Sequence, residues 1–224
     1  MPTITVHHLD SSRSQRILWL LEELELTYDI RQYKRHRSTM RAPADLKDIH
    51  PLGKAPVVTV DDEVFAESGA IIEALLDRFG EGRLRPEPGT KEHEQYRYFL
   101  HYAEGSLTPP LLIRLITNQL TSPKVPFFAR PLTGAVAKKI DGSFTQGELD
   151  LHGAYLNGVL AERTWFAGDQ ITGADVQMSF PIEAAVARGG FDQHSHVVRW
   201  LTQVQERPAY KRAVERGGPQ TLLS

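Results

Sequence analysis

The chain has 224 residues, of which 41% are hydrophobic and 24% charged, so it is long enough for two domains with ordinary cores. Its formal net charge of −2 gives no overall drive toward nucleic acid or an anionic membrane surface. It contains no cysteine, which excludes disulfides, thiolate metal sites and a cysteine nucleophile.

The first third of the chain alternates between strand and helix patterns. Short runs of β-branched and aromatic residues predict strands, and apolar residues three and four positions apart predict helices. The predicted order is a strand over 3–9, a helix with its apolar face over 17–24, a strand over 27–33, a short helix over 43–49, a hairpin of strands over 57–60 and 63–65, and a helix over 68–79. A strand–helix–strand unit pairs its strands in parallel, and a later hairpin adds antiparallel strands. We therefore expect a mixed four-stranded sheet with helices on its faces.

The remainder of the chain is predicted to be all helical. A segment rich in glycine and proline, 80–89, ends the strand pattern. We accordingly divide the chain into a first domain over 1–82, a linker over 83–90 and a helical domain over 91–224. The helices are expected over 91–119, 132–162, 174–188 and 194–207. Thr172 and Asp175 have the spacing of a capping box, in which each side chain binds the backbone of the other residue.

Two short segments in the first domain suggest a site for an extended anion. Pro56 precedes an apolar strand and has no N–H for a sheet ladder, which leaves the preceding peptide at Ala55 free for another partner. Glu67 and Ser68 open a helix, where unpaired N–H groups and the positive end of the helix dipole attract carboxylates. Alone, each segment is better explained as a plain structural feature: Pro56 as a strand start and Ser68 as a helix cap.

Together, the segments 53–58 (GKAPVV) and 67–72 (ESGAII) resemble the first domain of cytosolic glutathione transferases of the serine type, in a bacterial or fungal-like branch. The similarity covers nearly the whole chain. It implies a thioredoxin-like α/β domain with a mixed four-stranded sheet, followed by an all-α helical bundle. It also implies a detoxifying enzyme that joins the thiolate of reduced glutathione to small electrophiles, and a homodimer.

The proposed chemistry requires a thiolate near neutral pH. A thiol with a pKa of about 8.5 is only about 3% ionised at pH 7, and lowering that pKa by about two units corresponds to about 2.7 kcal/mol. One charged hydrogen bond at a helix start supplies roughly that amount. The resemblance places the donor in the turn before Arg16, with Ser12 first and Ser11 second. Ser14, a backbone amide or no activation are the alternatives, and residues 12–15 (SRSQ) also have the pattern of a plain capping box.

The other contacts follow from the chemistry of glutathione, a tripeptide with a carboxylate at each end and one ammonium group. Ser68 suits the γ-glutamyl carboxylate, Glu67 the ammonium, Ala55 before a cis Pro56 the cysteinyl backbone, and Lys54 the glycyl carboxylate. Lys54 has a surface lysine as its alternative, and Glu67 a helix-start residue. The electrophile pocket is assigned to Leu9, Tyr98, Tyr102 and Arg114.

Several other patterns carry no function. The nine histidines lack metal-binding spacing, so no metal is expected, and glutathione is a co-substrate. A basic patch around 34–37, with Arg31 and Arg41, is interpreted as a solvated loop with a secondary role near the glycyl end of glutathione. Neither nucleic acid nor membrane is expected as a partner, and the start of the chain lacks a secretion signal, which favours the cytoplasm. The rival functions are a glutathione-dependent disulfide or peroxide reductase and a non-catalytic glutathione-binding module.

Overall fold

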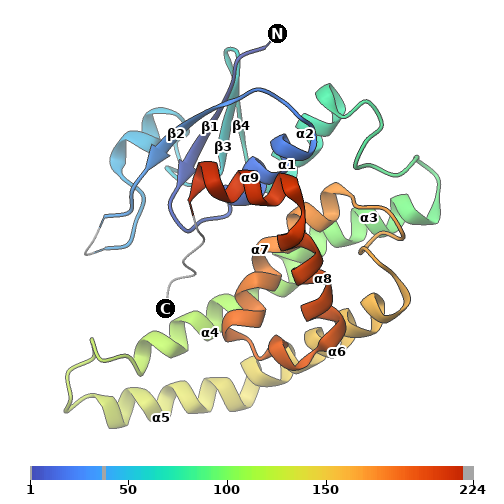
Figure 1. Cartoon of the computed structure of the whole chain (residues 1–224). Coiled ribbons are helices and arrows are strands. Elements are labelled where there is room, and N and C mark those ends of the chain that lie inside the picture. The colour runs from blue at the N-terminus through green and yellow to red at the C-terminus, as the bar shows by residue number, and fades with distance from the viewer. Residues whose placement is uncertain (1, 37–38, 219–224) are drawn as a thin grey trace.

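The computed structural model describes residues 2–36 and 39–218 of the chain. The N-terminal part is a four-stranded sheet flanked by helices (Figure 1). Its elements are β1 (Ile4–Leu9), α1 (Gln15–Glu23), β2 (Asp29–Tyr33), the 3₁₀ turn η1 (Ala44–Asp48), β3 (Val57–Val60), β4 (Glu63–Ala66) and α2 (Ser68–Phe79). The strand order is β2-β1-β3-β4, with β1 parallel to β2 and the other pairs antiparallel. The predicted mixed sheet of a thioredoxin-like domain is confirmed.

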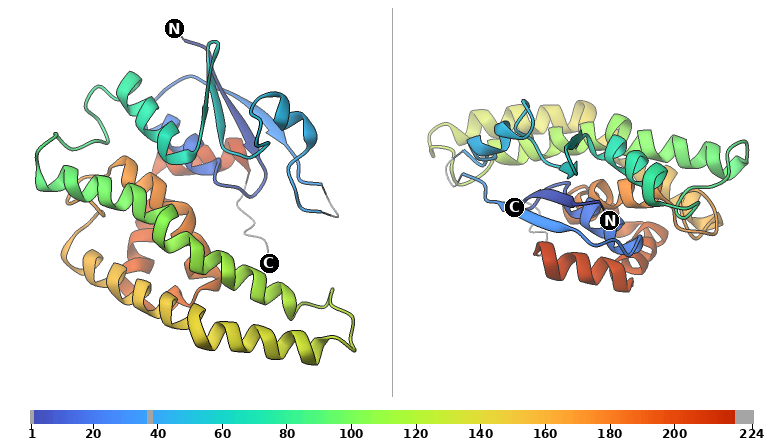
Figure 2. Two further views of the ribbon diagram at one scale, coloured as in Figure 1. Left: turned by 180° about the vertical axis from the view of Figure 1, so that it is seen from behind. Right: turned by 90° about the horizontal axis from the view of Figure 1, so that it is seen from above.

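The C-terminal part is helical. Its elements are α3 (Lys91–Tyr102), η2 (Ala103–Leu107), α4 (Thr108–Leu120), α5 (Arg130–Ile140), η3 (Asp141–Thr145), α6 (Gln146–Glu162), α7 (Gly173–Arg188), η4 (Phe191–Gln193), α8 (Ser195–Glu206) and α9 (Pro208–Gly217). Helices α4 and α5 form a long hairpin that projects beyond the rest of the molecule in two opposite views (Figures 1 and 2). None of the helices in the described part of the chain is long and apolar enough to cross a membrane.

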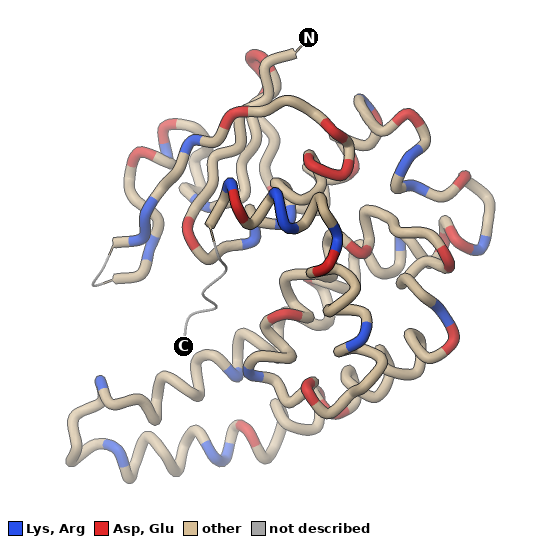
Figure 3. The backbone as a smooth tube through the Cα atoms, viewed as in Figure 1, with Lys and Arg blue, Asp and Glu red and all other residues tan. Residues whose placement is uncertain are grey.

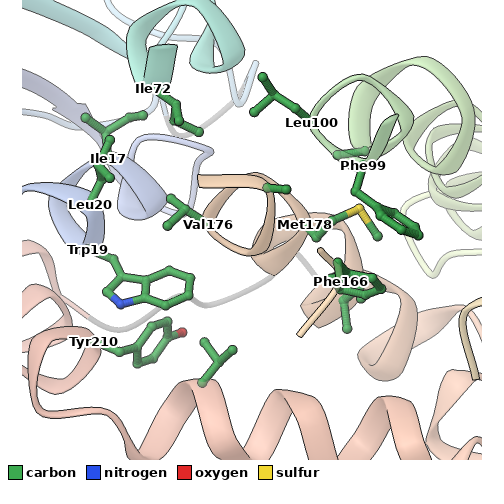
Figure 4. Close-up of a cluster of buried hydrophobic side chains, with 14 of the residues drawn as sticks. Ile17, Trp19, Leu20, Ile72, Phe99, Leu100, Phe166, Val176, Met178 and Tyr210 are labelled. Atoms are coloured by element: carbon green, nitrogen blue, oxygen red, sulfur yellow. The ribbon is translucent and has the colours of Figure 1, made fainter. Parts of the chain in front are cut away.

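Helix α7 lies at the centre of the hydrophobic core. Its Val176 and Met178 are completely buried between α1 on one side and α3 on the other (Figure 4). The predicted capping box fixes its start, because Asp175 accepts from the Thr172 backbone N–H at 2.9 Å. The same buried carboxylate accepts from the backbone N–H of Phe166 at 3.0 Å and from Trp200 Nε1 at 3.2 Å. Asp175 therefore joins three segments, and its predicted structural role is confirmed.

Two π-helical turns interrupt the long helices. The sequence predicts one helix over 91–119, whereas η2 separates α3 from α4, and η3 likewise separates α5 from α6. Each such turn accommodates one extra residue in a helix and is seen often at functional sites. Because η2 carries Glu104, the bulge directs this carboxylate toward α1, where it contacts Arg13 and Arg16.

Helix α9 was not predicted, since the last helix expected from the sequence ends at 207. It lies beside the sheet and α1 and follows directly on α8 (Figures 1 and 2). Small residues on its inner face allow close packing, and an added Cβ at Gly217 would lie 2.4 Å from Leu18 Cδ1. Tyr210 packs edge-on against Trp19 with 5.5 Å between ring centroids. Helix α9 thus packs against the N-terminal domain.

Candidate functional site

The sheet topology brings three separate segments to one edge. Strand β3 runs antiparallel to β1, with Val57 opposite His7, so the residues before Val57 lie near the end of β1. Strand β4 returns beside β3 with Ala66 opposite Val57, so the chain enters α2 at the same edge. The turn after β1, the Ala55–Pro56 peptide and the Glu67–Ser68 helix start are therefore neighbours, as the sequence interpretation required.

The Ala55–Pro56 peptide bond is cis, as predicted. Pro56 is buried and β3 begins at the next residue, so the proline is at the position where its missing N–H costs no ladder bond. Among the residues that the structure describes, no backbone group pairs with Ala55 in a turn or sheet. The peptide is placed to pair with an extended ligand.

A cavity of about 810 Å³ lies between the two halves of the molecule. The N-terminal half contributes the turn after β1 and the segments around η1 and before β3, while the helical half contributes α4 and α7. The apolar part of the lining consists of Leu9, Met40, Ala42, Pro43, Ala44, Leu52, Ala55, Leu111, Leu112, Leu115, Phe180, Pro181 and Ala184. The cavity has a size typical of small-molecule sites.

The cavity is strongly basic although the chain as a whole is slightly acidic. Seven cationic side chains belong to its lining, and none of the described lining residues is Asp or Glu. They are Arg13, Arg35, Arg41, Lys47, Lys54, Arg114 and Arg188. Arg13 is paired with Glu104 and Arg114 with Asp141, and the other five charges favour ligands with more than one negative charge.

Arg35 fixes the shape of the turn after β1. Its guanidinium donates to the carbonyls of Asp10 at 3.1 Å, Ser11 at 3.2 Å and Met40 at 3.0 Å. Ser11 has a φ of 48°, and these bonds hold its carbonyl in place. The solvated-loop interpretation of the basic patch is therefore wrong for Arg35, and Arg41 of the same patch also lines the cavity. Residues 37 and 38 lie outside the described residues.

Ser12 and Ser11, the two candidate hydroxyls, both line the cavity. Ser12 is only 5% exposed, and its Oγ lies 2.7 Å from Ser14 Oγ while accepting from the Ser14 backbone N–H at 3.2 Å. Ser14 Oγ lies in turn 2.8 Å from Nδ1 of His8, a buried residue of β1. The capping-box alternative for 12–15 is wrong, because α1 begins after Ser14 and no side chain caps it.

Arg16 has a structural role behind the cavity wall. Its side chain is fully buried, donates to the Gln177 carbonyl at 2.6 Å and pairs with Glu104 at 2.5 Å. Arg13 binds the same carboxylate at 3.1 Å from the cavity side. Burial opposes the ionisation of Glu104, but the two arginines outweigh it and hold the pKa of that carboxyl below its usual range.

The remaining predicted site residues fall into two groups. Leu9, Lys54, Ala55 and Arg114 line the cavity, whereas Pro56, Glu67 and Ser68 lie beside it at the sheet edge. Glu67 has a φ of 67°, a conformation that costs energy for a residue with a side chain and is found often at functional sites.

The two tyrosines predicted for the electrophile pocket are not part of the cavity lining. Tyr102 is buried and bonds His152, and Tyr98 stacks on Tyr102 with 5.6 Å between ring centroids. This position gives no support to the prediction that they contact an electrophile. The wall is instead built by α4 and α7, of which only Arg114 was assigned to the site from the sequence.

Comparisons with known proteins agree with this organisation of a thioredoxin-like domain, a helical domain and a cavity between them. The family model of the glutathione S-transferase N-terminal domain matches residues 10–78, and that of the C-terminal domain matches residues 145–208. Glutathione S-transferase 1 of Saccharomyces cerevisiae is 34% identical over 225 residues, which cover 96% of each chain. Glutathione S-transferase 3 of Schizosaccharomyces pombe is 36% identical over 221 residues, covering 98% of this chain and 90% of the relative.

A solved structure supports the same conclusion. The crystal structure of a glutathione S-transferase from Actinobacillus pleuropneumoniae superimposes with a TM-score of 0.82 at 34% identity, covering 98% of this chain and 95% of that one. The chain belongs to the glutathione S-transferase family. Within the described residues, no group of three or more His, Asp or Glu side chains is arranged to hold a metal ion.

Proposed function

We propose that the protein transfers the thiolate of reduced glutathione to small electrophiles in the cavity between its two halves. The observation that carries the proposal is the meeting of the Ala55 peptide, the Glu67–Ser68 helix start and Ser12 at one edge of a basic cavity. This set matches a molecule with two carboxylates, an ammonium group and a thiol.

Each group has a defined task in this proposal. Ala55 pairs with the cysteinyl backbone as an added strand does. The N–H groups and hydroxyl of Ser68 bind the γ-glutamyl carboxylate, and the Glu67 carboxylate binds the ammonium group. Lys54 neutralises the glycyl carboxylate. Ser12 then lies by the sulfur, which makes the enzyme one of the serine type.

The electrophile binds against the opposite wall. Leu111 and Leu115 of α4 and Phe180 of α7 offer it an apolar surface, and Arg114 lies on the same wall. Holding an electrophile there against a thiolate from the N-terminal half supplies proximity and a reactive nucleophile without a metal ion. Because the required thiol is the reduced form, a reducing cytoplasm is the compartment that suits the reaction.

Substitution of Ser12 tests the assignment. We expect Ser12→Ala to raise the pKa of bound glutathione by about one to two units, because a hydrogen bond to a charged group is lost. Conjugation of a chlorodinitrobenzene-type acceptor near pH 7 falls by about tenfold or more, since one pKa unit is tenfold in thiolate. Ultraviolet absorbance of the bound thiolate measures the first quantity, and Ser11→Ala is the matched control.

Two results would contradict the proposal. An unchanged thiolate titration in folded Ser12→Ala removes Ser12 from the chemistry, and no saturation with millimolar glutathione removes the binding site as a whole. Turnover of hydroxyethyl disulfide in place of the aromatic acceptor would establish the reductase alternative. Binding without turnover of either acceptor would establish a binding module.

We further propose a homodimer. Charged residues are sparse along the projecting α4–α5 hairpin (Figure 3), and several large apolar side chains are exposed there and on the adjoining η3 and α6. They include Ile116, Phe127, Phe128, Leu132, Phe144 and Leu151. Exposed apolar surface of this kind marks protein–protein interfaces. Light scattering on the protein as it elutes from a size-exclusion column gives the mass of the assembly.

A further inference from the structure

A chain of hydrogen bonds runs from the cavity to the last turn of α9. It connects Ser12 Oγ to Ser14 Oγ over 2.7 Å, Ser14 Oγ to His8 Nδ1 over 2.8 Å, and His8 Nε2 to the Gly217 carbonyl over 2.9 Å. His8 is 2% exposed and Ser14 is completely buried. Ser12 is the member that lines the cavity. Membership of the glutathione S-transferase family does not by itself account for Ser14, His8 or Gly217 in this series.

The Gly217 carbonyl determines which group donates in each hydrogen bond of this series. A carbonyl oxygen only accepts, so His8 Nε2 carries a hydrogen, and in a neutral ring Nδ1 is then an acceptor. Burial lowers the pKa of His8, so the ring is neutral near pH 7. Its buried Nδ1 lone pair needs a donor, and the nearest one is the Ser14 hydroxyl.

The direction continues to Ser12. The hydroxyl of Ser14 has two acceptors in reach, the Leu9 carbonyl at 3.4 Å and His8 Nδ1 at 2.8 Å, and the shorter contact is the better hydrogen bond. With its one hydrogen on His8, the hydrogen in the Ser12–Ser14 contact belongs to Ser12. The Leu9 backbone N–H also donates to Ser14 Oγ, at 3.2 Å, which agrees with Ser14 acting as an acceptor there. In this state Ser12 has no hydrogen for a thiolate, and it presents a lone pair to the cavity.

We propose that His8 is the proton acceptor for the thiol of bound glutathione, acting through Ser14 and Ser12. The inference rests on the proposed function. The S–H proton passes to Ser12 Oγ, the Ser12 proton to Ser14 Oγ, and the Ser14 proton to His8 Nδ1. Three X–H bonds break and three form, with a thiolate and an imidazolium as the products.

The transfer reverses every hydrogen bond in the chain. The imidazolium donates from Nδ1 to Ser14, Ser14 donates to Ser12, and Ser12 now donates to the thiolate. One event therefore removes the thiol proton and creates the donor that stabilises the sulfur. Ser12 is the catalytic residue of this scheme, and His8 and Ser14 are positioning residues that act through it.

Few charges act on the ring. The Asp10 carboxylate favours the imidazolium, and burial opposes it more strongly. The elements packed around His8 contribute the neutral Gln32 from β2, its pairing partner in the sheet, and the neutral Gln15 from α1. From α9, Arg216 lies next to Gly217, but its guanidinium is held by Glu22 at 3.1 Å.

Proton counting tests the proposal directly. Absorbance gives the amount of thiolate formed when glutathione binds, and calorimetry in buffers of different ionisation enthalpy gives the protons released to solvent. The same titration with S-methylglutathione, which lacks the thiol, subtracts protons from all other groups. We expect the wild-type protein near pH 7 to release fewer protons than the thiolate it forms, because the negative charge of the thiolate favours the imidazolium and His8 retains the proton. Equal numbers would overturn the proposal.

Two variants interrupt this series of hydrogen bonds at different points. His8→Gln keeps an N–H for the Gly217 carbonyl but replaces the basic Nδ1 by an amide, which cannot take up a proton, and Ser14→Ala leaves the His8 and α9 residues unchanged. In both, we expect the pKa of the bound thiol to rise by about one unit or more and the two counts to become equal. Binding of S-methylglutathione stays unchanged, which a merely structural loss would not leave intact.

The control is His7→Gln. His7 is the next residue of β1, lies on the other face of the sheet and contacts Tyr33 Oη at 3.0 Å. It should leave both counts and the thiol pKa as in the wild type. If the pKa of the bound thiol is the same as in the wild type in folded His8→Gln and Ser14→Ala, proton transfer to His8 is refuted, and the proposed function is not. Absence of S-methylglutathione binding in the wild type would refute the proposed function with it.

Discussion

Helix α1 is attached to the helical half by ion pairs at both of its ends, and the two attachments differ in burial. At its start, the fully buried Arg16 depends on the single carboxylate of Glu104. At its end, Glu22 and Glu23 face three arginines of the α8–α9 region whose side chains are 29% to 48% exposed: Arg207, Arg212 and Arg216.

The comparison shows that burial and redundancy, more than the number of pairs, decide what an ion pair contributes. A buried charge that loses its partner cannot recruit water, whereas an exposed one can. We therefore expect the first attachment to fail on a single substitution and the second to tolerate one.

The largest effect is expected for Glu104→Ala. It leaves Arg16 buried without a counter-charge, which lowers the free energy of unfolding by about 3–5 kcal/mol in denaturant titrations. Activity falls as well, because Phe180, a wall residue of the cavity, lies 5.5 Å from the guanidinium of Arg16.

The Glu104 carboxyl also determines whether stability rises or falls with pH. The pKa of Glu104 is lower in the folded state than in the unfolded chain, so its stabilisation is present above the usual glutamate pKa and lost as the pH falls through the folded value. Glu104→Gln, which cannot ionise, should lose less stability than the wild type on acidification below about pH 4.5. An identical loss would place the acid sensitivity elsewhere.

An intermediate effect is expected for Gly217→Ala in the second attachment. The new Cβ would lie 2.4 Å from Leu18 Cδ1 and 2.6 Å from Gln15 Oε1, so α9 or those side chains must move. Overpacking of this kind costs about 1–3 kcal/mol. Thermal unfolding measures the loss.

Gly158→Ala in α6 is the matched control, because a Cβ there meets nothing within 4 Å. It should gain about 0.5–1 kcal/mol from helix propensity. If both variants were stabilised alike, α9 could not be packed on α1 at this distance.

The smallest effect is expected for Arg212→Ala. Its side chain is 48% exposed, and Arg216 still pairs with Glu22 after its removal. The midpoint of denaturant unfolding should hardly change, and the change should be smaller still at high salt. A loss as large as that of Glu104→Ala would contradict the distinction between the two attachments.

Local patterns were sufficient to predict the mixed four-stranded sheet and the Thr172–Asp175 capping box, whereas the cis Pro56 was expected from the resemblance to glutathione transferases. Each depends on residues that are close in sequence, such as the alternation along a strand or a cap three residues from its partner. The segments 53–58 and 67–72 were also predicted to form one site. They lie at the same edge of the sheet because strand pairing alone places them there.

Other features depend on distant contacts and were missed. Helix α9 is short and poor in apolar residues, and apart from Tyr210 the residues that it buries are the small ones Ala209, Ala213 and Gly217. Its arginines look solvated in the sequence, yet they pair with glutamates about 190 positions away. Alternation along β1 puts His8 on the same face as Val6, but nothing local indicates that a distant carbonyl selects its tautomer.

The π-helical turn η2 makes the length of the chain between α3 and α4 critical. One residue of an α-helix corresponds to a rotation of about 100°. Removing a single residue such as Gly105 would convert the turn to regular helix, because the turn holds the one extra residue, and the Glu104 carboxylate would no longer be directed at Arg16. An added residue that the turn cannot absorb would rotate Leu111 and Leu115 out of the cavity wall. Insertions and deletions in this stretch should therefore be far less tolerated than substitutions at its exposed positions.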